Sequence, residues 1–154
     1  LAQTFSKGYG MAGNRCGYIV GPQEVMTEVR KVSTHAFYAA PTAAQLAAAR
    51  ALAGPGEAWA ATARELYGAT ARRAAARLGL PAPEGSTFLF FDVAPALDER
   101  GLAGLLERAA DRGLLVAPGA SFGPYPTWVR LCYTSVEPER ALRGVEILAG
   151  LLGR

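Results

Sequence analysis

The stretch that decides the fold occupies residues 4–18 and reads TFSKGYGMAGNRCGY. It places a lysine, Lys7, and an arginine, Arg15, around a glycine-rich turn, together with the hydroxyls of Thr4 and Ser6. A lysine amine in a partly desolvated pocket loses proton affinity and condenses with an aldehyde. The planar fork of an arginine suits a dianionic phosphate, and hydroxyls supply further donors. The stretch therefore predicts a site that holds a phosphate and an aldehyde together.

This pattern, Ser/Thr-x-Ser-Lys and then Gly-Met-x-Gly-x-Arg-x-Gly-Tyr, resembles the lysine segment of class I/II aminotransferases, which are pyridoxal-phosphate enzymes of fold type I, the aspartate aminotransferase fold. The resemblance implies that Lys7 is the catalytic lysine, bound covalently to pyridoxal 5'-phosphate. It also implies that Thr4, Ser6 and Arg15 bind the cofactor phosphate. Taken without the resemblance, a surface lysine in a flexible glycine loop is the alternative interpretation.

A second pattern lies at residues 118–133, where PGASFG is followed after four residues by the strand-like run WVRLCY. An arginine in an apolar strand is costly to bury unless it meets an anion, so Arg130 is a candidate anion ligand. By resemblance to the same family, Arg130 binds the α-carboxylate of the amino-acid substrate. The alternative is an arginine on a solvated strand edge.

The only histidine, His35, lies in residues 34–41, which we expect to form a loop between two helices. In the family that loop reaches the active site of the neighbouring subunit, so the resemblance makes His35 and Tyr38 candidate substrate contacts. Aspartate-type members have, roughly at the position of His35, an arginine that binds the side-chain carboxylate of the substrate. This departure argues against a dicarboxylic substrate, and a histidine that only packs is the alternative.

Helical and strand-like patterns alternate along the rest of the chain and predict an α/β fold. Strands are expected at residues 16–21 (buried), 87–93, 114–117 and 128–133, and helices at 22–33, 42–53, 57–78, 97–112 and 138–152, with a loop at 118–127. Thr42 and Gln45 form the pattern of a capping box. The long helix is expected to turn the following residues to one side: Trp59, Ala63, Leu66, Thr70, Ala74 and Leu78.

A cluster of helix breakers, LPAPEG at residues 80–85, divides the chain. By resemblance, residues 1–80 are the C-terminal end of the large cofactor-binding domain and include the long interdomain helix. Residues 81–154 are then the small C-terminal domain.

Composition excludes several classes of function. Of the 154 residues 51% are hydrophobic, which is enough for a sizeable core, and a net charge of +3 spread over helices predicts no nucleic-acid partner. Cys16 and Cys132 lie in apolar runs, so we expect two buried thiols and a reducing, cytoplasmic setting. The chain has neither a cluster of metal ligands nor an apolar run of membrane-spanning length.

Together these patterns and the resemblance predict an aminotransferase that uses pyridoxal 5'-phosphate to move an amino group between an amino acid and a 2-oxo acid, as a homodimer at full length. Because the chain begins at Leu1, close to the lysine, we expect a C-terminal fragment that is inactive alone. A decarboxylase, lyase or cyclase of the same fold is one alternative. A non-catalytic, aminotransferase-like regulatory module is another.

Overall fold

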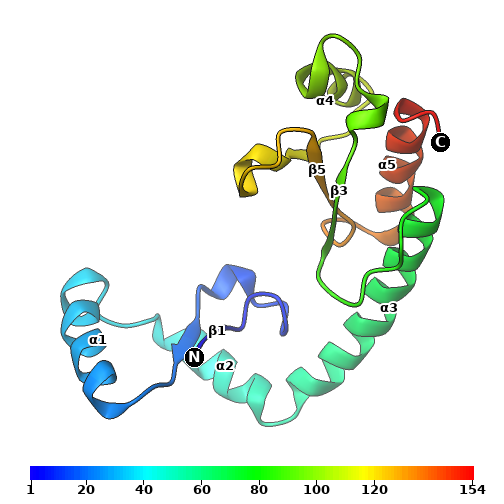
Figure 1. Ribbon diagram of the computed structural model, residues 1–154. Coiled ribbons are helices and arrows are strands. Elements are labelled where there is room, and N and C mark those ends of the chain that lie inside the picture. Colours follow the sequence, from blue (N-terminus) through cyan, green and yellow to red (C-terminus); the bar gives the residue numbers. More distant parts are fainter. The chain divides into compact units, whose positions relative to one another are not determined.

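A computed structural model describes all 154 residues of the chain, which form two compact units. The first comprises Leu1–Ala63 and the second Arg64–Arg154. The division falls inside the long helix α3 (Pro55–Arg77), whereas the sequence indicates a boundary at residues 80–85 (Figure 1). The difference arises because the C-terminal half of α3 packs in the core of the second unit.

The first unit contains a two-stranded antiparallel sheet and two complete helices. Its elements are β1 (Ala2–Thr4), the 3-10 helix η1 (Ala12–Asn14), β2 (Gly17–Ile19), α1 (Gln23–Ala36) and α2 (Thr42–Leu52). Strands β1 and β2 pair so that Thr4 lies opposite Gly17. A Cβ atom at Gly17 would stand 2.4 Å from the carbonyl oxygen of Gln3, so glycine is required for the strands to approach this closely. The small core of this unit buries Phe5, Cys16, Ala44 and Ala48.

Strand β2 exists where the sequence predicts a strand, but its burial is predicted wrongly. Tyr18, Ile19 and Val20 are 45% to 56% exposed. Within the chain β2 pairs only with β1, and α1 has no buried residue that could cover it. Only Cys16, just before the strand, enters the core.

Helix α1 extends three residues beyond its predicted end, so the predicted loop at residues 34–41 is shorter. The hydroxyl of Thr34 donates a hydrogen bond to the carbonyl oxygen of Arg30 at 2.8 Å, and the amide of Phe37 donates to the carbonyl of Ser33 at 3.1 Å. The backbone bond from Phe37 closes the last turn of the helix, which runs through Ala36, and residues 37–41 remain as the loop.

The capping box predicted for α2 does not form. Pro41 is the N-cap, because its carbonyl accepts the first helical bond, from the amide of Gln45 at 3.1 Å. Thr42 already lies inside the helix and makes no capping bond. The side chain of Gln45 instead donates from Nε2 to the carbonyl oxygen of Ala40 at 2.7 Å.

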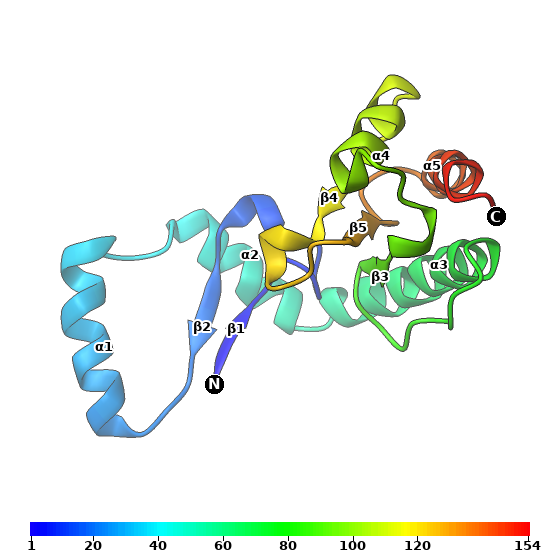
Figure 2. The ribbon, with the colours of Figure 1, turned by 45° about the horizontal axis from the view of Figure 1, so that its top comes forward.

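The second unit packs helices against one face of a three-stranded antiparallel sheet with the order β3-β5-β4. Its further elements are β3 (Phe88–Asp92), η2 (Ala94–Ala96), α4 (Gly101–Asp111), β4 (Ala117–Pro118), η3 (Gly119–Phe122), β5 (Trp128–Cys132) and α5 (Pro138–Leu151). The C-terminal half of α3 runs beside α5 in both views, and Arg77 Nε donates to Glu146 at 2.7 Å (Figure 2).

The central strand β5 sorts its side chains by their two-residue period. Val129 and Leu131 are buried in the core, whereas Trp128 and Arg130 point to the opposite face and are half-buried. Cys132 continues that outward set and is exposed, so the prediction that both cysteines are buried is wrong for this one.

The buried stripe of α3 differs from the predicted one. Trp59 and Leu66 are 39% and 47% exposed. The side chains of the stripe that are buried are mostly small: Ala63, Thr70, Ala71, Ala74 and Ala75, with Leu78 just after the helix. Of these, Ala71, Ala74 and Ala75 allow the C-terminal half of the helix to pack closely in the core of the second unit.

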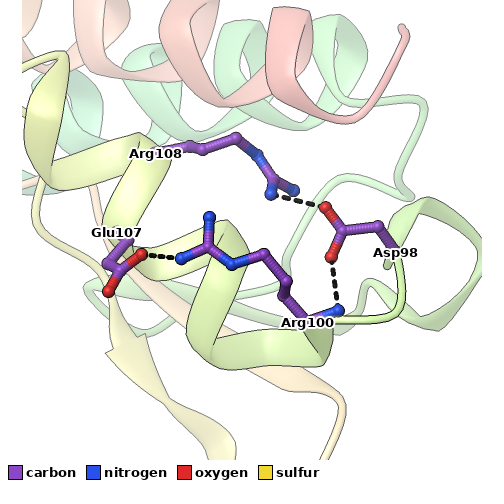
Figure 3. Close-up of polar contacts among 4 residues, drawn as sticks. All are labelled: Asp98, Arg100, Glu107 and Arg108. Carbon is purple, nitrogen blue, oxygen red and sulfur yellow. Dashed lines mark hydrogen bonds and ion pairs between the residues drawn. The ribbon is translucent and has the colours of Figure 1, made fainter.

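Helix α4 begins four residues later than predicted, because Asp98 closes a turn in front of it. Asp98 Oδ1 accepts a bond from the amide of Arg100 at 3.0 Å, and Gly101 follows at a φ of 59°, which glycine adopts readily. Figure 3 shows the same carboxylate accepting a bond from Arg108 at 2.6 Å, beside an ion pair between Arg100 and Glu107. Both pairs are on the surface, where such contacts contribute about 0–1 kcal/mol each.

None of these helices combines the length and the apolar character needed to cross a membrane.

Candidate functional site

The hydroxyls of Thr4 and Ser6 lie side by side where β1 ends. The amide of Ser6 donates a hydrogen bond to Thr4 Oγ1 at 3.1 Å. The Thr4 hydroxyl in turn donates to Ser6 Oγ at 2.8 Å. This short turn follows directly from the two hydroxyl residues standing two positions apart. It fixes both oxygens at one end of the sheet.

Arg15 reaches the same place from the segment between η1 and β2. Its backbone has a φ of 51°, in the left-handed region, and its guanidinium donates to the carbonyl oxygen of Ala12 at 3.0 Å. Thr4, Ser6 and Arg15 line one pocket of about 230 Å³, completed by Cys16 and Gly17. The lining contains one cation and no acidic side chain, so the pocket attracts an anion.

Lys7 follows this pocket in a turn formed by residues 6–9. Its side chain is exposed and takes part in none of the ion pairs of the chain. The partly desolvated setting that the sequence predicts for this amine is therefore absent here, because no side chain of the chain covers it. Lys7 itself is not among the residues that line the pocket.

The lysine turn packs against the start of α3 through two close contacts that are not predicted from the sequence. A Cβ atom at Gly10, where φ is 65°, would stand 2.7 Å from the indole of Trp59, and one at Gly56 would stand 2.5 Å from the ring of Tyr9. Tyr9 in turn packs against the buried ring of Phe5, with centroids 5.6 Å apart. Two glycines thus let the turn rest directly on the start of α3.

His35 and Tyr38 are not brought to this pocket. His35 occupies the last turn of α1, and Tyr38 follows with a φ of 65° and 82% of its surface exposed. A larger, mainly apolar pocket of about 620 Å³ lies between β2, α1 and residues 37–41 and shares Arg15 with the first, but neither His35 nor Tyr38 lines it. Both side chains face solvent in this chain.

Arg130, in the second unit, is held by aromatic rings. Its guanidinium carbon lies over the ring of Phe122 at 4.1 Å from the centroid and over that of Phe88 at 5.0 Å. No ion pair of the chain involves Arg130. The side chain therefore keeps its full positive charge while it is half-buried, and such a cation is ready to bind an anion.

The loop that carries Phe122 is folded down onto the same face of the sheet. The ring of Phe90 meets Tyr125 and Phe122 edge-on, with centroids 5.0 Å and 6.0 Å apart. A Cβ atom at Gly119 would stand 2.5 Å from the carbonyl oxygen of Tyr125 and 2.7 Å from Cβ of Trp128, so the loop can close only with glycine there.

The carboxylate of Asp92 holds the C-terminal end of this loop, at Thr127, next to β3. Asp92 Oδ1 accepts bonds from the hydroxyl of Thr127 at 2.7 Å and from the amide of Ala94 at 2.9 Å. These bonds, the one from Thr127 first, hold the pKa of Asp92 below its ordinary value. The amide of Val93 also donates to the carbonyl of Thr127 at 3.0 Å, so β3 and the loop are joined twice.

The family of the chain follows from comparison with known proteins. A family model for aminotransferase class I and II matches residues 1–148. The chain belongs to this family. It is 33% identical to the aspartate/prephenate aminotransferase of Thermus thermophilus over 97% of this chain and 40% of that protein. It is 35% identical to the histidinol-phosphate aminotransferase of Symbiobacterium thermophilum over 99% of this chain and 40% of that one.

Solved structures of aminotransferases share the fold. A single mutant of the Thermus thermophilus aspartate aminotransferase superposes with a TM-score of 0.85 at 28% identity, over 97% of this chain and 40% of that one. LysN, an α-aminoadipate aminotransferase from Thermus thermophilus, was solved with N-(5'-phosphopyridoxyl)-L-leucine. It superposes with a TM-score of 0.84 over 99% of this chain and 41% of that one, and at 22% identity this shows a likeness of fold alone. The predicted α/β fold class is confirmed. The chain spans about 40% of the length of these aminotransferases.

The hydrogen bond from Thr127 to Asp92 leads to a testable prediction. The pKa of Asp92 is lowered in the folded chain, so its ionised form stabilises the fold above the pKa of the unfolded chain, and this contribution is lost as the pH falls through the folded value. Thr127→Val removes the main donor and should raise the pKa of Asp92 towards 3.8. An NMR titration of the Asp92 carboxyl carbon measures this.

The control is Thr62→Val. The Thr62 hydroxyl donates to the carbonyl of Ala58 inside α3, at 3.2 Å, so its loss should leave the Asp92 titration unchanged. An Asp92 pKa that is the same in Thr127→Val as in the parent protein would show that the hydroxyl does not hold the carboxylate.

Proposed function

We propose that this chain is the part of a pyridoxal-phosphate-dependent aminotransferase that carries the cofactor lysine, the phosphate-binding residues and the substrate arginine. The enzyme moves an amino group between an amino acid and a 2-oxo acid. The observation that carries the proposal is the meeting of Thr4, Ser6 and Arg15 in one pocket directly before Lys7. In the class I/II pattern these three positions correspond to phosphate ligands, and all three line the same pocket here.

The pocket fits the phosphate of the cofactor chemically. Two hydroxyls and a guanidinium supply hydrogen-bond donors, and the lining holds no carboxylate that would repel a dianion. Arg15 binds the phosphate through its planar fork, and Thr4 and Ser6 add hydroxyl donors. When bound, pyridoxal phosphate supplies an electron sink for the bond that breaks at the α-carbon of the substrate.

The remaining roles follow from the chemistry of each side chain. Lys7 would hold the cofactor through its aldehyde group, and the Nζ of Lys7, when free, would take the proton from the substrate α-carbon as general base and carry it as the general acid of the transfer. Arg130 binds the α-carboxylate, and this contact orients the bond to be broken. Its charge, not neutralised within the chain, supports this role.

The other parts of the proposal concern the whole protein. His35 and Tyr38 are exposed and lie outside the phosphate pocket, which is consistent with substrate contacts made across the interface of a homodimer. Activity then requires more of the family's length than these 154 residues. A cytoplasmic location is supported by the two cysteines, which form no disulfide.

The role of Lys7 is testable by chemical trapping. Borohydride reduction of the full-length protein with pyridoxal 5'-phosphate should fix the cofactor mass on the tryptic peptide that spans Lys7 and ends at Arg15. The chain has only one other lysine, Lys31, which pairs with Glu28 on α1 at 2.6 Å. Lys7→Arg should abolish the labelling, and Lys31→Arg should leave it intact. Labelling at Lys31, or none in the folded protein, would refute the assignment.

The role of Arg130 is testable by steady-state kinetics. Loss of a charge-assisted bidentate contact should cost about 2–5 kcal/mol, so Arg130→Ala should lower kcat/KM for amino acids while the cofactor stays attached. Arg130→Lys should recover part of the loss, because lysine keeps the charge without the fork. Arg73→Ala is the matched control, since this exposed arginine pairs only with Glu139. Unchanged kinetics in Arg130→Ala would exclude the role.

A further inference from the structure

Two rings from different segments hold the guanidinium of Arg130. Phe122 comes from η3 in the loop after β4, and Phe88 begins β3. The guanidinium carbon lies 4.1 Å and 5.0 Å from the two ring centroids, so the cation rests against two aromatic faces. No acidic side chain accompanies them, although a carboxylate is the usual partner of a half-buried arginine.

We propose that Phe122 and Phe88 are positioning residues for substrate binding: they hold the guanidinium of Arg130 in place for a carboxylate without neutralising it. This inference rests on the proposed function of Arg130. A carboxylate partner would fix the side chain equally well but would occupy its donors and cancel its charge. An aromatic face attracts the cation, carries no net charge and leaves the N–H donors at the edge of the guanidinium for the substrate.

The ring of Phe122, the closer of the two, is itself held by a further aromatic contact, which favours an ordered guanidinium before a substrate arrives. Phe122 meets the edge of Phe90, and Phe90 also packs against Trp128 with centroids 5.0 Å apart. Phe90 lies opposite Arg130 in the register of β3 and β5. A long, flexible side chain that is fixed in advance loses less entropy when it binds its ligand, so affinity rises.

Phe122 should contribute more than Phe88, because it is the closer ring and its loop is fixed by the tight contact at Gly119. Removal of its aromatic face should weaken the binding of amino acid and 2-oxo acid alike, as both carry the carboxylate. Such a loss raises KM with little change in kcat.

The experiment compares Phe122→Leu and Phe122→Tyr in the full-length enzyme. Phe122→Leu keeps an apolar side chain without the ring and should raise KM about tenfold, while kcat stays within about twofold. Phe122→Tyr keeps the ring and should stay near the parent value. Phe88→Leu, the second variant, should raise KM by a smaller factor. Phe91→Leu is the control, because Phe91 is buried in the core behind the sheet and should change the melting temperature without changing KM.

A double-mutant cycle separates this inference from the proposed function. In an Arg130→Ala background Phe122→Leu should have no further effect on KM, because the group it positions is gone. An equal effect in both backgrounds, or no effect of Phe122→Leu and Phe88→Leu while Arg130→Ala is impaired, would overturn the positioning role alone. An unimpaired Arg130→Ala enzyme would overturn the proposed function of Arg130 and this inference with it.

Discussion

The two-residue period of β5 is the constraint on which the second unit depends. Val129 and Leu131 must face the core, so Arg130 between them has to face the other way. A cation at the centre of a sheet is costly unless something replaces its water. Here the aromatic rings of β3 and of the loop before β5 do so, and they leave the charge available. The same alternation that builds the core thus creates the anion-binding face.

The first unit depends on a different constraint: glycine is needed at the points where its backbone is approached most closely. Gly17 lets β1 and β2 pair closely, and the register places Thr4 opposite Gly17, two residues after Arg15, so that Thr4 and Arg15 line one pocket. Gly10 lets the lysine turn approach Trp59 of α3, and Gly56 lets the start of α3 approach Tyr9 of the turn. Gly10 and Gly17 of the motif, and Gly56 of α3, therefore do more than add flexibility, because each allows one close contact that a Cβ atom would prevent.

The sequence predicts regular elements well where one periodicity dominates. Four elements start within two residues of their predicted positions: helix α3 at Pro55, helix α5 at Pro138, strand β3 at Phe88 and strand β5 at Trp128. The meeting of Thr4, Ser6 and Arg15 in one pocket is also expected from the motif and from its resemblance to the lysine segment of class I/II aminotransferases. The catalytic and binding roles of these residues remain predictions.

The features that are not predicted from the sequence depend on contacts between distant segments, or on competition between local hydrogen bonds at the start of a helix. The exposure of Tyr18 and of Lys7 depends on what covers them, and apolar content or motif membership cannot report that. Asp98 closes a turn that delays the start of α4, and Pro41 takes the N-cap position expected for Thr42. The stacking of Phe122 on Arg130 joins two segments across a folded loop, and only the aromatic residues of PGASFG and of β3 hint at it.

The central claim is that the pocket of Thr4, Ser6 and Arg15 binds the phosphate of the cofactor. The most direct test compares the dissociation constants of the full-length protein for pyridoxal 5'-phosphate and for pyridoxal, which lacks the phosphate, in the parent and in Arg15→Gln. The account predicts that the parent strongly prefers the phosphorylated aldehyde. Arg15→Gln should lose about 1.5–3 kcal/mol of binding for that ligand and almost none for pyridoxal. Equal affinity of the parent for the two aldehydes, or an equal loss for both in the variant, would contradict it.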